Sequence, residues 1–338
     1  MSDSLLYKLR SGKPSKAFFF PKRGYLKRCI PDCFFSMRRK SCLEQVEMRS
    51  DKDYIYERVN YYNKLQHPVI LPEQVLHEHK HSYYVYLDKI RNFRPSTFHK
   101  AYYFDLKDVT CWFNQNLRIS YIPGDVYFTP QYPSIVKSRL LKEDNAYSVV
   151  LKLDKLRHFI FLNDPVPFSK KRDQAIFRGK IRLSRIREKF LHMYFGSSLC
   201  DCGVVGRNEG YPDAWMTPKK TIREHLDYKF IMALEGNDVA SNLKWVMSSN
   251  SIAVMTRPTC ETWFMEGKLI PDYHYIEIKD DLSNLEEKLT YYINHPAEAE
   301  LIIRHAHEYV AQFFDTERER LISLLVMDKY FQMTGQKQ

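Results

Sequence analysis

The chain has 338 residues, 44% of them hydrophobic, which is enough for one large core or two of ordinary size, since domains usually run to ~100–200 residues. Fifty-two Lys and Arg against 41 Asp and Glu give a net charge of +11, which favours phosphorylated partners without separating nucleic acid, phospholipid and nucleotide. Seven cysteines, an odd number over so long a chain, argue against a disulfide framework and indicate a reducing compartment.

A basic cluster lies near the amino terminus, between Lys13 and Arg39, and Asp32 is its one acidic residue. Aromatic residues are interleaved with the basic ones, as in KAFFFPKRGYLKR and CFFSMRRK. The cluster fits either a solvated basic face or a patch that touches anionic lipid head groups or a phosphorylated glycolipid, where each basic residue can add ~1 kcal/mol. The same end of the chain lacks the apolar run of a signal peptide, and no window approaches the ~20 apolar residues of a membrane span. We therefore expect a cytoplasmic protein.

Residues 1–144 are predicted to form a first domain that mixes short strands with a helix. Tyr-rich stretches at 82–87 and 100–106 have the composition of β-strands. A helix is predicted around residues 51–66, before Pro68 and Pro72 interrupt the chain.

Residues 145–315 are predicted to form a second domain of the α/β class, because apolar β-prone runs alternate there with helical patterns. This alternation indicates a largely parallel sheet covered on both faces. Such a sheet binds its ligand at the carboxyl ends of its strands, beside helix amino termini whose N–H groups hold phosphate. Residues 316–338 are expected to form a carboxyl-terminal helix or tail. The predicted strands are 147–153, 157–162, 174–179, 250–255 and 273–278, and the predicted helices are 184–194, 240–247, 284–294 and 297–314.

Two clusters have metal-like residue types, the run HEHKH, with His77, His79 and His81, and the run CDC, with Cys200 and Cys202. Structural zinc sites pair Cys at C-x-x-C spacing with a second pair downstream, and the chain has no second pair. We therefore expect a hydrated His-rich turn, ordinary half-buried cysteines and no metal site. The chain also lacks G-x-G-x-x-G, Walker A and G-x-S-x-G motifs, so dehydrogenase, P-loop and hydrolase functions lose their usual support.

The segment from Tyr228 to Met255 reads as strand, polar turn, helix and strand. Its turn, EGNDVAS, offers Gly236 for close backbone approach and Asn237, Asp238 and Ser241 as helix caps. One interpretation is a simple capped turn; the other places a diphosphate against the helix start, with Lys244 near enough to compensate its charge.

This segment, together with AIFRGK (175–180) and YHYIEIKDDLSNLEEKL (273–289), resembles glycosyltransferase family 90. That family includes protein O-glucosyltransferases of the secretory pathway, fungal capsule xylosyltransferases and bacterial lipopolysaccharide core transferases. The likeness spans roughly residues 125–289 and looks nearest the bacterial branch, through GDVYFTPQYPSIVKSR, RHFIFLNDPVPFSKKRD and GNDVASNLKWVMSSNS.

The resemblance implies a GT-B fold, with two Rossmann-like domains facing a cleft, the first binding the acceptor and the second a UDP-sugar. It further implies an inverting, metal-independent transfer of a hexose to a lipopolysaccharide core or other surface glycan, with no cofactor. The basic cluster would then hold the protein against the inner face of the inner membrane.

The chemistry needs a base for the acceptor hydroxyl and positive charge or N–H groups for the departing UDP. Asp125 in PGDV is the predicted base, because the catalytic Asp of the family lies upstream of a segment similar to PSIVKSR; Asp164 and Asp201 are held in reserve.

Donor-binding residues follow from the same resemblance. The run FRGKIR matches the FRG of the family, with Arg178, Gly179 and, one residue offset, Arg182 as a phosphate contact, although Arg178 can instead be structural. Asn242 stands where the eukaryotic enzymes carry a nucleotide-facing Arg. Glu261 and Glu266 fall where GT-B enzymes often hold ribose, or they are surface acids. The expected donor set is Arg178, Gly179, Arg182, Gly236, Asn237, Ser241, Asn242, Lys244 and Glu266.

The basic charge of the chain also fits two other functions. The basic, aromatic amino-terminal half suits a nucleic-acid-binding protein, but no RRM, zinc-finger or helix-turn-helix signature accompanies it, so no nucleic-acid partner is expected. A sugar or lipid kinase would also use a basic phosphate site, but the chain lacks the Gly-rich loop and the HRD-type sequence of kinases.

Overall fold

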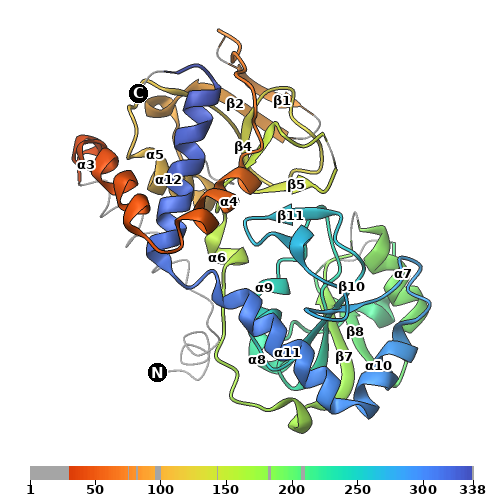
Figure 1. The fold of residues 1–338 in the computed structure, drawn as a ribbon. Helices are drawn as coiled ribbons and strands as arrows, with labels where there is room; N and C mark the ends of the chain where they lie inside the picture. The colour runs from red at the N-terminus through yellow and green to blue at the C-terminus, as the bar shows by residue number, and fades with distance from the viewer. Residues whose placement is uncertain are drawn as a thin grey trace, which may run out of the picture. The chain divides into compact units, whose positions relative to one another are not determined.

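The computed structural model describes residues 30–336, except 75, 81–82, 96–99, 143, 182–183 and 207–209. The described chain divides into two compact units. The central unit comprises Arg157–Thr259 and Glu266–Gln312. The N-terminal unit comprises the described residues up to Leu156, together with Cys260–Met265 and the residues from Phe313 onward. Each unit has its own five-stranded sheet, so the predicted α/β class is confirmed (Figure 1).

The central unit is built on a parallel sheet, as predicted. Its strands lie in the order β12-β10-β9-β7-β8 and every pair is parallel. Phe230 and Met232 of β9 are buried in the cluster that includes α7 and α10, while the intervening Ile231, also buried, alternates to the other face. Helices α7, α10, α8 and α9 all contact strands of this sheet, as expected for a parallel sheet covered on both faces. Its elements are η5 (Phe168–Lys170), β7 (Arg172–Gly179), α7 (Arg185–Tyr194), β8 (Cys200–Val204), η6 (Asp213–Trp215), α8 (Ile222–His225), β9 (Tyr228–Met232), α9 (Leu243–Met247), β10 (Ile252–Met255), η7 (Glu266–Lys268), β12 (Ile276–Glu277), α10 (Leu285–Asn294) and α11 (Pro296–Ala311).

The N-terminal unit has a mixed sheet in the order β1-β2-β3-β4-β6, antiparallel through β3 and parallel beyond it. A separate antiparallel pair, β11 with β5, joins Cys260–Met265 to the rest of this unit. The carboxyl-terminal α12 packs against α4, α5 and α3. Its elements are α3 (Asp32–Glu44), η3 (Gln45–Met48), α4 (Lys52–Tyr62), β1 (Leu76–Lys80), β2 (Tyr83–Lys89), η4 (Ile90–Asn92), α5 (Lys100–Thr110), β3 (Arg118–Ile122), β4 (Ser134–Val136), β5 (Ser138–Leu140), β6 (Ser148–Val150), β11 (Cys260–Thr262) and α12 (Thr316–Met333).

Two predicted strands are wrong. Residues 100–106 open the helix α5, because their buried side chains continue at helical spacing through Leu106, Val109 and Thr110, and this period overrides the strand preference of the tyrosines. Residues 157–162 form the end of the short α6 (Lys155–His158) and an unpaired connection instead of a strand. Ile160 is buried there without any ladder, and a short apolar run does not reveal whether its burial comes from a sheet.

Six of the seven cysteines lie in the described part of the chain, and all six are free. Cys33 is exposed, whereas the others are buried: Cys42, Cys111, Cys200, Cys202 and Cys260. Cys200 and Cys202 lie on the edge strand β8 with their thiols in the core of the central unit, so the half-buried state expected for CDC is wrong.

Candidate active site

Three loops meet at the carboxyl ends of β7, β9 and β10 in the central unit. Arg187, from the first turn of α7, joins two of them, because its Nε and Nη2 donate to the carbonyl oxygen of Leu234 (3.1 and 2.8 Å) and its Nη1 to that of Lys180 (3.0 Å). The Glu235 carboxylate joins the third loop by accepting bonds from the N–H and hydroxyl of Thr259 (3.1 and 2.6 Å). This is the edge at which parallel sheets bind ligands. Sequence reasoning missed Arg187, whose only signal is its place just after the FRGKIR run.

Gly236 lies in the turn after β9 and is in tight contact with Arg187. A Cβ atom at Gly236 would lie 3.1 Å from Nη2 and 3.3 Å from the guanidinium carbon of Arg187. The guanidinium is held by three bonds to carbonyl oxygens, so a side chain at position 236 would have to displace it by a few tenths of an ångström against those bonds. The predicted close backbone approach thus has a physical basis in this contact, with a side chain of the protein itself.

The helix after this turn is short and starts later than predicted. α9 has five residues and its N-cap is Asn242, so the expected caps Asn237, Asp238 and Ser241 all lie before the cap. The Asn242 amide does not cap the helix but donates to the Met232 carbonyl oxygen (3.0 Å). The structure therefore brings Gly236, Asn237, Ser241 and Asn242 together in one loop, at a helix of little more than one turn.

Lys244 and Glu266 are brought together as a buried ion pair. Their side chains are 0% and 1% exposed, and the ammonium of Lys244 donates to a carboxylate oxygen of Glu266. Glu266 therefore compensates the Lys244 charge inside the protein. Glu261 is also buried and belongs to the N-terminal unit, where its carboxylate accepts a 2.7 Å bond from Arg139.

Arg178 and Gly179 end strand β7, but the Arg178 guanidinium is occupied by protein groups. It donates to the carbonyl oxygens of Phe177 (2.9 Å) and Asp201 (2.8 Å) and pairs with the Asp201 carboxylate. A Cβ at Gly179 would lie 2.8 Å from the Phe177 ring. These contacts match the structural role that the sequence left open for Arg178.

Asp201 is held as a carboxylate by its neighbours. Burial acts to raise its pKa, but hydrogen bonds from Tyr228 and Arg178 outweigh burial and hold the pKa of Asp201 below its usual range. Burial and the bond to Asp201 raise the pKa of Tyr228 to about 12. The second reserve acid, Asp164, is also engaged, since its carboxylate accepts from Lys171 (2.8 Å) and from the Asn250 N–H (3.0 Å) and is 1% exposed.

Asp125 lies in the N-terminal unit, beyond the carboxyl end of β3. Gly124, with φ of 107°, adopts the left-handed conformation that turns the chain there. The Asp125 side chain is 28% exposed, and one of its oxygens lies 2.7 Å from the ammonium of Lys137, which follows β4 and is 1% exposed. The backbone N–H of Val126 donates to the Ser138 hydroxyl (3.2 Å). The residues that follow Asp125 and Lys137 are thus also bonded to each other, which fixes this loop. Of the three candidate bases, Asp164 is closed to a substrate, while Asp125 and Asp201 retain partly exposed carboxylates.

Some predicted residues lie outside the described part of the chain. Arg182 is one of them, as are His81, the side chains of His77 and His79, and the basic cluster before Ile30. Among the described residues, no group of three or more His, Cys, Asp or Glu side chains is placed to hold a metal ion, and no helix is long and apolar enough to cross a membrane.

Comparison with known proteins gives two findings. The family model for glycosyl transferase family 90 matches residues 150–335. A protein of Dichelobacter nodosus described as O-glucosyltransferase LpsA is 36% identical over 321 residues, which cover 94% of this chain and 96% of that protein.

Proposed function

Because the chain belongs to glycosyltransferase family 90, we propose that it transfers a hexose from a UDP-sugar to a hydroxyl of a lipopolysaccharide core or other surface glycan, with inversion. The observation that carries this proposal is the 36% sequence identity with an O-glucosyltransferase, in an alignment that covers 94% of the chain. Glucose is accordingly the first sugar to test. The two units would form the two domains of a GT-B enzyme, the N-terminal unit for the acceptor and the central unit for the donor.

In the proposed reaction, Asp125 takes the proton of the acceptor hydroxyl. The freed oxygen attacks C1 of the sugar from the face opposite the leaving group, the bond between C1 and the phosphate oxygen breaks, and UDP departs with the electron pair. Two features support Asp125, its partly exposed carboxylate and its fixed loop. Lys137 is a positioning residue, because its buried ammonium holds the Asp125 carboxylate in one orientation.

The donor diphosphate would lie at the carboxyl edge of the central sheet. Lys244 is compensated by Glu266, and α9 is too short for a full helix dipole, so these two do not carry the phosphate charge. Backbone N–H groups of the 235–242 loop, held in place by Arg187, are the better support, together with Arg182.

A screen of UDP release tests the function directly. The protein is incubated with deacylated core oligosaccharide and, in separate reactions, with UDP-glucose, UDP-galactose, UDP-N-acetylglucosamine and UDP-xylose. We expect UDP release that depends on the oligosaccharide and is highest with UDP-glucose. If all four donors stay intact with every acceptor preparation, the proposal fails.

We expect UDP to bind in the absence of divalent metal. The reason is that the proposed phosphate contacts are backbone N–H groups and the cationic side chain of Arg182, which need no bridging ion. Calorimetric titration with UDP before and after addition of EDTA measures the effect, and the expected dissociation constants agree within a factor of about two. Affinity that disappears on chelation and returns with Mg²⁺ or Mn²⁺ would show that the diphosphate is held through a metal.

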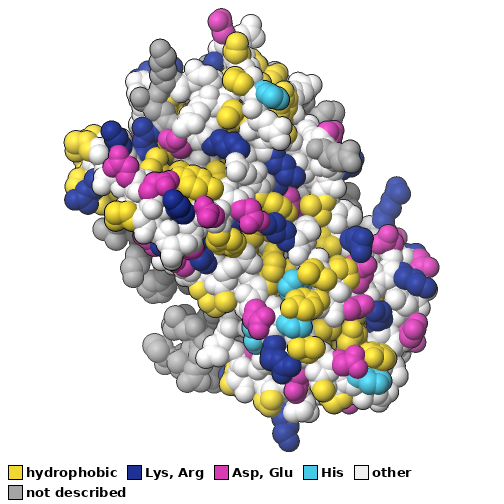
Figure 2. Space-filling view, in the orientation of Figure 1, with side chains coloured by type: hydrophobic (Ala, Val, Ile, Leu, Met, Phe, Trp, Pro, Cys, Tyr) yellow, Lys and Arg dark blue, Asp and Glu magenta, His cyan; other side chains and the backbone are white. Residues whose placement is uncertain are grey.

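The exposed face of α3 supports a peripheral membrane location. Phe34 and Met37 are 41% and 74% exposed, and the Arg38 guanidinium lies 4.4 Å from the centre of the Phe34 ring. Hydrophobic and basic side chains gather over α3 at the left of the space-filling view (Figure 2). Such a face suits an anionic lipid surface, with rings at the head-group level and guanidinium groups near phosphate.

We therefore expect the protein to sediment partly with inner-membrane vesicles and to be released by salt, because ions screen exposed charges. Sedimentation in about 50 mM and about 500 mM NaCl measures the release, because the Debye length falls from ~14 Å to ~4 Å between these two concentrations. Met37→Gln should lower the bound fraction at low salt, and Met48→Gln serves as the matched control, since Met48 is also highly exposed but follows α3. Binding that persists in high salt and yields only to detergent would contradict an electrostatic attachment.

A further inference from the structure

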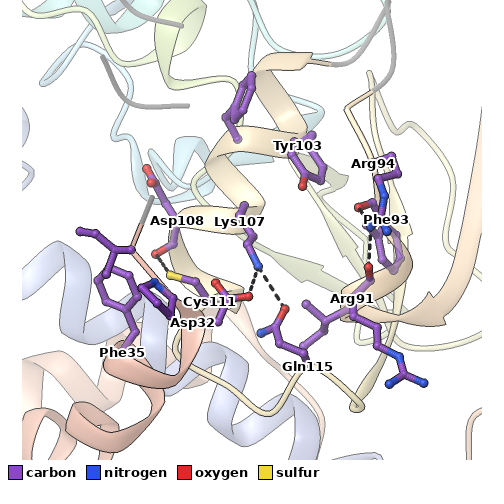
Figure 3. Close-up of a pocket in the computed structure, with 14 residues that line it drawn as sticks. Asp32, Phe35, Arg91, Phe93, Arg94, Tyr103, Lys107, Asp108, Cys111 and Gln115 are labelled. Atoms are coloured by element: carbon purple, nitrogen blue, oxygen red, sulfur yellow. Dashed lines mark hydrogen bonds and ion pairs between the residues drawn. The ribbon is translucent and has the colours of Figure 1, made fainter. Parts of the chain in front are cut away.

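A pocket of about 370 Å³ opens in the N-terminal unit between the start of α3, η4 and α5 (Figure 3). Its volume lies within the ~300–1,000 Å³ of small-molecule sites. Four aromatic residues are among those that line it, Phe35 of α3, Phe93 after η4, and Tyr103 and Phe104 of α5. Figure 3 shows Phe35 and Phe93 on opposite sides of the view, with Lys107 between them.

The pocket is separate from the proposed catalytic Asp125. Ile90 and Arg91 donate backbone bonds to the carbonyl oxygens of Leu117 (2.9 Å) and Gln115 (3.1 Å), so η4 adjoins the start of β3. Asp125 follows the end of the same strand. A five-residue strand spans about 13 Å between its first and last residues. A sugar bound in the pocket is therefore too far from Asp125 to be the one whose hydroxyl Asp125 deprotonates.

The lining of the pocket carries a net charge of +1, from Arg91, Arg94 and Lys107 against Asp32 and Asp108. Lys107 is paired with Asp32 (2.6 Å), and Asp108 lies 3.5 Å from Lys155, which is also 3.6 Å from Asp105. The guanidinium of Arg94 bonds only to the carbonyl oxygens of Arg91 and Phe93, and no acid pairs with Arg91 or Arg94 within the described part of the chain. Both arginines are exposed at the pocket. Guanidinium groups match the paired oxygens of phosphate and carboxylate.

We propose that this pocket binds an anionic sugar residue of the acceptor glycan, one ring that carries a phosphate or a carboxylate. The aromatic wall takes the C–H face of the ring, the Lys107, Asp32 and Gln115 network takes its hydroxyls, and Arg91 and Arg94 take its anionic group. The proposal rests on the proposed function, because it assigns the pocket to the acceptor of that reaction. The pocket would thus recognise a charged residue at some distance from the hydroxyl that is glycosylated.

Titration of the purified full chain with small sugars tests the pocket. Glucose 6-phosphate, glucuronic acid and glucose are each titrated and followed by ligand-observed NMR, with saturating UDP present to exclude sugar phosphate from the donor site. We expect one or both anionic sugars to bind at least about tenfold more tightly than glucose, since a charge-assisted hydrogen bond is lost with neutral glucose. A preference for the phosphate or for the carboxylate identifies the anionic group.

Arg91→Gln and Arg94→Gln should each weaken binding of the preferred sugar about tenfold. Arg304→Gln, which removes an exposed arginine of α11 in the central unit, is the matched control and should leave binding unchanged. With deacylated core oligosaccharide, the two pocket variants should raise KM and leave kcat unchanged. Equal binding of all three sugars, or equal effects of the three variants, overturns the proposal. A wild-type protein without UDP-sugar turnover refutes the proposed function, while the titration still decides the pocket.

Discussion

Asp125→Asn should lower the rate of sugar transfer by ~10²–10⁴-fold and leave the affinity for UDP nearly unchanged. The carboxylate acts on the acceptor proton in the transition state, and the amide that replaces it keeps the shape but accepts no proton. Asp125 belongs to the N-terminal unit, whereas the proposed nucleotide loops belong to the central unit. Steady-state kinetics with core oligosaccharide, calorimetry with UDP and thermal melting make up the measurement.

The alternative role for Asp125 is to balance the charge of Lys137, which is 1% exposed and lies 2.7 Å away. The double variant Asp125→Asn with Lys137→Met distinguishes the two roles. If Asp125 only balances charge, the double variant regains both melting temperature and activity; if Asp125 is the base, stability returns and turnover does not. Near wild-type transfer by the single variant would place the base elsewhere, and Asp201, 29% exposed, would be tried next.

Lys244→Met should destabilise the protein by ~3–5 kcal/mol, because it leaves the buried carboxylate of Glu266 without its partner. Both side chains are almost fully buried, so water cannot replace the lost ammonium. Lys244→Met combined with Glu266→Leu should recover most of the loss, since removing both charges also removes their desolvation penalty. Urea unfolding followed by fluorescence measures the three free energies of unfolding.

The contrasting outcome is a Lys244→Met variant of normal stability and strongly reduced UDP affinity. It would mean that Lys244 turns toward the diphosphate when the donor binds, as the sequence suggested. Calorimetry with UDP on the same samples separates this outcome from simple unfolding.

Sequence reasoning succeeded where the pattern repeats along the chain. The central sheet was predictable because short apolar runs within β7, β9 and β10 alternate with helical patterns. It failed at 100–106 and 157–162, where tyrosines and a short apolar run are buried by neighbours distant in sequence. The burial of an apolar side chain does not reveal whether a helix or a strand places it.

The candidate site was predictable only as a set of loops. The order of the strands brings Gly236 and Asn242 to one edge, which the βα pattern already implied. The partners were not predictable, because Lys137 meets Asp125 across the ends of two strands and Glu266 meets Lys244 from a separate turn. Pairs of this kind depend on the tertiary fold, which brings residues distant in sequence together and which local sequence does not predict. Arg187 was missed for the same reason.

The rate at which the buried cysteines are modified measures how often each unit opens. Burial raises the pKa of Cys200 to about 12 and that of Cys202 to about 11, so at neutral pH both remain thiols and react only after the central unit opens. Cys42 and Cys260 report in the same way on the N-terminal unit, while exposed Cys33 reacts at once and serves as the internal standard. Mass spectrometry of thiol modification over time therefore gives two local opening free energies from one sample.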